Sequence, residues 1–67
     1  MLRLAVPYLE ESVAKQPQNP LYRYHLGAAY ARFGKTAEAR RELEQALKIS
    51  QDFHGAAETR RILATLD

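Results

Sequence analysis

A spaced set of residues that recurs with a 34-residue period constrains this chain more than any other feature. Its fullest copy consists of Leu26, Gly27, Tyr30, Gly34, Ala39, Leu43, Ala46 and Leu47. Ala5 and Leu9 lie 34 residues before Ala39 and Leu43, and Pro17 lies 34 residues before Gln51. A period of about 20 to 50 residues indicates stacked supersecondary units and not a self-contained enzyme fold. The recurrence therefore predicts a repeat architecture.

Four helical segments joined by short turns account for nearly the whole sequence. We expect them at about residues 2–15, 20–33, 36–49 and 53–66. In the first, Leu2, Val6, Leu9 and Val13 recur at spacings of four, three and four, which places them on one helical face. Pro7 is unfavourable inside a helix, so we expect the first few residues to fray. No segment shows the alternation of a strand, and the fold class is therefore all-α.

Helix boundary signals support these segments. Asn19 is a good N-cap, and Pro20 suits the first helical position. Gly34 suits the left-handed conformation that ends many helices. Thr36 is expected to cap the third segment, and Gly55 is expected to weaken the first turn of the fourth. The elements are therefore predicted to form antiparallel helix–turn–helix units.

The residues from Arg23 to Gln51 resemble a tetratricopeptide repeat. That family's pattern is W-x2-L-G-x2-Y, then A-x3-F, then P. The chain has Leu26-Gly27 and Tyr30 in register, then Ala39 and Leu43. It departs from the pattern with Arg23 for Trp, Leu43 for Phe and Gln51 for Pro. A generic helical hairpin with the same spacing is the alternative interpretation.

The resemblance implies a division of the chain. Residues 1–17 would be the second helix of a preceding repeat, residues 19–51 one complete repeat, and residues 52–67 a C-terminal capping helix with a polar outer face. A strict 34-residue shift places Arg60 and Arg61 on the Leu-Gly pair and fails, whereas a turn three residues longer places Leu63-Ala64 there. The closing stretch is similar to the tails of bacterial tetratricopeptide proteins in envelope and exopolysaccharide systems, so we expect the C-terminal part of a bacterial array.

Composition argues against catalysis, cofactors and metals. The chain has 67 residues and no Cys, and its two histidines, His25 and His54, are far apart in sequence and on different segments. Metal sites need three or four converging ligands, and acid–base catalysis needs paired groups in a shielded pocket. We therefore predict a protein that is not an enzyme and that binds no cofactor.

Charge and hydropathy also limit the partners. Ten basic and eight acidic residues give a net charge of +2, and the two signs alternate along the helices. The aromatic cluster at residues 22–25 would suit base stacking, but no basic stripe accompanies it, so nucleic acid is only a remote alternative. No apolar run approaches the roughly 20 residues that span a bilayer. We predict no membrane insertion and leave the compartment open between cytoplasm and periplasm or envelope.

The second segment carries the predicted binding surface. Leu21, Tyr24, Ala28 and Ala31 share one face, distinct from that of Leu26 and Tyr30. The resemblance implies that this face lines a concave groove for a peptide or partner helix, with Leu21, Tyr24, Ala28, Ala31 and Arg32 as contact residues. The alternative is that the face packs against the first segment or another copy. Arg23 is expected to face solvent. The residues at His25 and Ala28-Ala29 lack the Asn of the family's carboxylate clamp, so binding of chaperone tails is not predicted.

The N-terminal segment offers a second, competing function. Leu2, Leu4 and Val6, with Tyr8 nearby, are expected to leave apolar surface uncovered, and such surface tends to be buried by association. We therefore weigh a structural role in homo-oligomerisation, through this end, against the interaction module.

Overall fold

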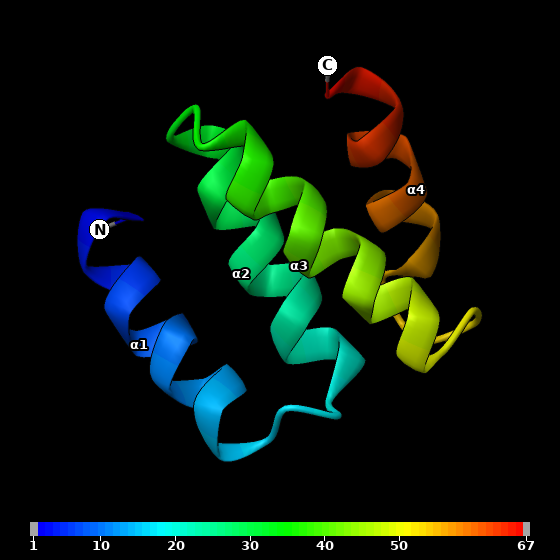
Figure 1. Ribbon diagram of the computed structural model, residues 1–67, viewed down its shortest axis with the longest axis horizontal. Helices are drawn as coiled ribbons and strands as arrows, with labels where there is room; N and C mark the ends of the chain where they lie inside the picture. The colour runs from blue at the N-terminus through cyan, green and yellow to red at the C-terminus, as the bar shows by residue number, and fades with distance from the viewer. Residues whose placement is uncertain (1, 67) are drawn as a thin grey trace.

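Four α-helices form the protein in the computed structural model, which describes residues 2–66 and the side chains of residues 5–66. They are α1 (Leu2–Lys15), α2 (Pro20–Arg32), α3 (Thr36–Ile49) and α4 (Ala56–Thr65). The helices lie side by side as antiparallel hairpins in chain order (Figure 1). The predicted all-α class is confirmed. Pro7 lies inside α1, which begins at Leu2, and the expected fraying of the first residues stays a prediction.

The boundaries of α2 follow from its capping residues. The Asn19 side-chain oxygen accepts hydrogen bonds from the N–H groups of Leu21 at 3.0 Å and Tyr22 at 3.2 Å. At the other end, Gly34 adopts φ 75°. The N–H groups of Gly34 and Lys35 donate to the carbonyls of Ala31 and Tyr30, which is the Schellman arrangement. Both predicted signals are therefore confirmed.

Two predicted boundary features are wrong. Thr36 is the first residue of α3 and does not cap it, because the N-cap position is Lys35, which makes no side-chain capping bond. The fourth helix begins at Ala56 and not at residue 53 or 54. Gly55 therefore lies before the first turn, where its φ of 112° reverses the chain at a conformation that side chains with a Cβ rarely adopt.

The core lies where α1 and α3 cover the two sides of α2. Its buried residues include Val13, Leu26, Tyr30 and Ala39, and Leu66 at the end of α4 packs against them. Gly27 lets α3 approach closely, because a Cβ there would lie only 2.6 Å from Cγ of Leu43. The small residue Gly27 and the large residue Leu43 of the repeated pattern thus account for the close packing of α2 on α3.

Candidate functional site

The α2 side of the molecule is the inner side of the helix stack. Helix α2 contacts both neighbours, α1 and α3, and also reaches α4, whereas no contact joins α1 to α3 within residues 2–66. When every second helix of a stack makes contact on one side, as α2 and α4 do, and the helices between them do not, the stack curves toward the side with the contacts. Helices α2 and α4, which contact one another, therefore lie on the inner side of the stack.

The five predicted groove residues differ in their exposure. Arg32 is exposed, whereas Leu21, Tyr24, Ala28 and Ala31 are half-buried. Ala31 packs against the buried core cluster. Leu21, Ala28 and Arg32 lie at positions separated by seven and four residues and so share one helical strip.

Tyr24 lies at the edge of this strip, against the connection between α3 and α4. The centroid of its ring is 6.2 Å from that of Phe53. A Cβ placed on Gly55 would lie 3.0 Å from Cδ2 of the Tyr24 ring. Tyr24 thus serves the docking of α4 as well as the surface, which the sequence alone did not indicate.

His25 lies on the same strip but is not among the residues predicted from the sequence to line the groove. Its side chain is exposed, and its ring centroid lies 5.0 Å from that of Tyr24. Residues 21, 25, 28 and 32 have spacings of four, three and four, which is the signature of one helical face. That spacing is present in the sequence, but the predicted groove residues did not include His25, whose residue type pointed instead to a metal ligand, a clamp position or the aromatic cluster at residues 22–25. We call Leu21, His25, Ala28 and Arg32 the α2 strip.

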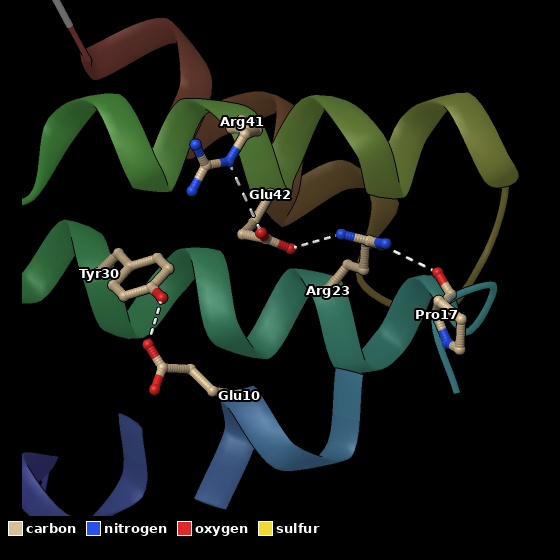
Figure 2. Close-up of polar contacts among 6 residues, drawn as sticks. All are labelled: Glu10, Pro17, Arg23, Tyr30, Arg41 and Glu42. Carbon is tan, nitrogen blue, oxygen red and sulfur yellow. Dashed lines mark hydrogen bonds and ion pairs between the residues drawn. The ribbon is translucent and has the colours of Figure 1, made fainter. Parts of the chain in front are cut away.

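A buried ion pair joins α2 to α3 on the opposite side of α2 (Figure 2). Nη1 of Arg23 donates to Oε1 of Glu42 at 2.9 Å, and Nε of Arg23 donates to the Pro17 carbonyl, also at 2.9 Å. The two side chains are only 18% and 10% exposed. The expectation that Arg23 faces solvent is therefore wrong, because the buried carboxylate of Glu42 and the carbonyl of Pro17 hold its guanidinium against the helices.

A second polar contact joins α2 to α1 (Figure 2). The Tyr30 hydroxyl donates to Oε2 of Glu10 at 2.6 Å. Burial and this hydrogen bond to a carboxylate raise the pKa of Tyr30 to about 12. The contact fixes α1 against α2.

Apolar surface is exposed at the end of the molecule where α1 begins and α2 ends. Phe33 is 42% exposed and Tyr8 is 70% exposed. Val6, Pro7, Phe33 and Lys35 line a hollow of about 360 Å³. Val6 itself is half-buried and packs against the core cluster. The side chains of Leu2 and Leu4, also predicted to mediate self-association, lie outside the described residues.

Among the side chains of residues 5–66, no three His, Asp or Glu residues lie close enough to hold a metal ion. His25 and His54 are both exposed and lie on α2 and on the α3–α4 connection. In residues 2–66, no helix has the length and apolar character that crossing a bilayer requires.

The architecture is that of an α-solenoid, in which helical hairpins stack and the inner helices line a concave surface. The protein-family model of the tetratricopeptide repeat matches residues 2–64, and the chain belongs to that family. No curated protein and no solved structure matches the chain. Tetratricopeptide repeats generally mediate protein–protein interaction and are typically non-enzymatic modules.

Proposed function

We propose that this domain is a non-catalytic interaction module that binds a peptide or a partner helix along the α2 strip. The observation that carries the proposal is that Leu21, His25, Ala28 and Arg32 remain accessible on the inner side of the stack, where no other described helix covers them fully. Tyr24 and Ala31 flank the strip on the side of α4. The remaining contact residues predicted from the sequence thus form the border of the same surface.

The strip also suggests what kind of ligand fits. Leu21 and Ala28 offer apolar contact, and His25 and Arg32 offer donors or positive charge on the same face. An extended or helical peptide with an apolar anchor and an acidic residue would match both features. The small side chain of Ala28 leaves room for the ligand between the larger residues.

A peptide library displayed on phage, selected against the purified domain, tests this proposal. Ala28→Arg should abolish binding of the selected peptides, because it fills the strip without removing a large native side chain. Ala14→Arg is the matched control, since Ala14 is an exposed helical alanine on α1. Backbone amide shifts on peptide addition should concentrate in α2. Peptides that bind Ala28→Arg as well as the parent protein would contradict the proposal.

Tyr24→Ala is a less selective test than Ala28→Arg. Because Tyr24 contacts the Phe53 ring and lies against Gly55, its loss would disturb the docking of α4 together with the surface. Amide chemical shifts of α4 in the free Tyr24→Ala protein should therefore be measured as well. If they match those of the parent protein, a loss of peptide binding reports on the surface and not on the docking of α4.

The second candidate function is self-association through the end where α1 begins. The observation that favours it is the apolar hollow at Val6, Pro7 and Phe33, beside the exposed Phe33 ring. Leu2, Leu4 and Val6 remain the proposed contacts, and Phe33 is added to them. Sedimentation velocity should show a dimer that Phe33→Ser weakens. A monomer at high concentration would rule out this function.

The proposed organisation keeps residues 1–17 as the second helix of a preceding repeat and residues 19–51 as one complete repeat. Residues 52–67 then form the helix that closes the stack. Nucleic acid stays the remote alternative, and it is disfavoured because Lys15, Arg23 and Arg61 each pair with a carboxylate. An affinity for DNA or RNA that falls steeply with salt concentration would overturn the ranking of nucleic acid as a remote alternative.

A further inference from the structure

Helix α3 carries a hollow of about 390 Å³ on its outer side. The lining consists of six residues of this one helix, which are Ala37, Arg40, Arg41, Glu44, Gln45 and Lys48. The buried residues of α3 are at positions 39, 42, 43 and 46, and none of them lines the hollow. Within residues 2–66, α3 contacts α2 and α4, and neither helix contributes to the lining. The hollow is thus open with both of these neighbours in place.

Four of the lining residues form an exposed strip along the helix. Residues 37, 41, 44 and 48 have spacings of four, three and four, which places them on one helical face, and all four are exposed. We call Ala37, Arg41, Glu44 and Lys48 the α3 strip. Its charges run positive, negative, positive, because Glu44 lies between the two cations. At a rise of about 1.5 Å per residue, Arg41 and Lys48 lie about 10 Å apart along the helix axis.

The charges that line the hollow do not neutralise one another. Glu44 lies four residues from both Arg40 and Lys48, a spacing at which ion pairs form on helices. Among the side chains of residues 5–66, however, none of these three residues takes part in an ion pair. Their charged groups are therefore available to a ligand.

Arg41 also retains positive charge. Its Nε lies 4.0 Å from Oε2 of Glu42, but Oε1 of the same carboxylate already accepts from Arg23 at 2.9 Å (Figure 2). One carboxylate thus serves two arginines. The sequence has ten basic and eight acidic residues, of which the hollow has three and one. Because the remaining residues have seven of each sign, the whole formal charge of +2 is located at the hollow.

We propose that the α3 strip binds a helical segment of a partner protein whose charges run acidic, basic, acidic. One carboxylate of the partner pairs with Lys48, a second carboxylate seven residues later pairs with Arg41, and a Lys or Arg at the fourth residue between them pairs with Glu44. The argument for this partner is charge complementarity. A helix running antiparallel to α3 matches the spacing, because both helices have the same rise and period. The α3 strip lies on a different helix from the α2 strip, so each can be tested without the other.

The negative charge in the middle of the strip favours a peptide over a nucleic acid. The backbone of DNA or RNA is negative at every phosphate, so it cannot place a positive group opposite Glu44. In addition, none of the six lining residues is aromatic, and a base would have no ring on which to stack. A peptide sets the charge at each position independently and can match all three charged residues of the strip.

Two alanine-based peptides of identical composition serve as probes. At the first, fifth and eighth positions of one helical face, the alternating peptide has Glu, Lys and Glu, and its isomer has Glu, Glu and Lys. A lactam bridge on the opposite face keeps both helical, because isolated short helices are marginal in water. Titration into the isotope-labelled protein at low ionic strength should shift backbone amides of residues 37–48. The isomer should bind about tenfold more weakly, because it replaces two ion pairs by two repulsions.

Variants of the protein test the individual pairs. Arg41→Gln and Lys48→Gln should each weaken binding of the alternating peptide about two- to fivefold, as expected for one exposed ion pair. Lys15→Gln is the matched control, since this exposed lysine of α1 already pairs with Glu11. Glu44→Lys should reverse the preference, so that a peptide with Glu at all three positions binds more tightly than the alternating peptide.

Four results would overturn the proposal. Equal affinity for the alternating peptide and its isomer would show that the order of charges is not recognised, and the absence of shifts in α3 would show that the strip binds neither. Shifts confined to the α2 strip would do the same and leave the proposed function standing. Tighter binding of a DNA duplex than of the alternating peptide would favour nucleic acid, and a dimer that Glu44→Lys abolishes would favour a second copy of the chain.

Discussion

The close approach of α2 and α3 at Gly27 allows a quantitative test of the packing. A Cβ at this position would lie 2.6 Å from Cγ and 2.7 Å from Cδ2 of Leu43, and 3.3 Å from the carbonyl oxygen of Ala39. Leu43 is fully buried, so its side chain cannot turn away into solvent. The obstruction therefore involves the branch point of a packed side chain and a backbone atom, and not the end of a flexible one.

Two effects of Gly27→Ala oppose one another. Alanine in place of glycine inside a helix stabilises it by about 1 kcal/mol. Overpacking of a filled core costs about 1–3 kcal/mol, and the buried position of Leu43 favours the upper half of that range. We therefore expect Gly27→Ala to lower the free energy of unfolding by about 1–2 kcal/mol.

The background variant Leu43→Ala should reverse the sign of this effect. It removes both of the closest atoms and leaves only the Ala39 carbonyl, so Gly27→Ala should then stabilise the protein by about 0.5–1 kcal/mol. The coupling between the two sites is thus about 2 kcal/mol, within the range seen for residues in contact. Ala28→Gly is the control, because it reports the helix propensity at the adjacent position and should cost about 1 kcal/mol in both backgrounds.

Urea denaturation followed by circular dichroism measures these differences. Leu43→Ala alone costs about 2–5 kcal/mol, which is a large share of the roughly 3–10 kcal/mol expected for a domain of this size. The parent protein, the two single variants Gly27→Ala and Leu43→Ala, and the double variant should therefore all be measured in the same concentration of a stabilising osmolyte. If Gly27→Ala stabilises the protein equally in both backgrounds, the reasoning about close approach is refuted.

Three further perturbations have defined outcomes. Gly55→Ala should lower the free energy of unfolding more than Gly34→Ala. Both residues have positive φ, but only Gly55 has other atoms within 4 Å of the position that a Cβ would take, namely those of the Tyr24 and Phe53 rings. Hydrogen exchange of Gly55→Ala should show that protection is lost first in α4. Arg23→Met should destabilise the protein by about 3 kcal/mol, since it leaves Glu42 buried without its main partner, and thermal melts should show much of the loss recovered by adding Glu42→Leu. Ultraviolet titration should show one tyrosine ionising near pH 12, and Tyr30→Phe should remove that phase. Because the pKa of Tyr30 is raised on folding, its contribution to stability is complete below about pH 10 and is lost as the pH rises through about 12.

The fold could be predicted from the sequence because its signals are local. Asn19 and Pro20 act on adjacent backbone groups, and Gly34 takes a conformation that depends on its own φ. The start of α4 could not be predicted in the same way. Gly55 begins that helix in a left-handed conformation imposed by the reversal of the chain after α3, and the Tyr24 ring that lies against it comes from a distant helix. Tertiary contact, and not propensity, sets that boundary.

The candidate surface was predictable in part for a related reason. Helical periodicity identifies which residues share a face, and it places Leu21, Ala28 and Arg32 together. It does not say which neighbour covers the edge of that face. Tyr24 and Ala31 are partly covered because α4 and the core border the strip, and His25 is exposed because nothing in the described chain lies over it.

Arg23 shows most clearly how a departure from a family pattern is compensated. The pattern has Trp at this position, and an arginine there was expected to turn outward. Desolvating a guanidinium is costly unless its donors are satisfied. Here Glu42 and the Pro17 carbonyl each accept one hydrogen bond from it, so an ion pair fills the space between α2 and α3. Within the side chains of residues 5–66, Arg60 makes only the carbonyl contact and remains exposed. The difference between the two arginines is that α3 supplies Glu42 to Arg23, whereas no carboxylate among the side chains of residues 5–66 pairs with Arg60.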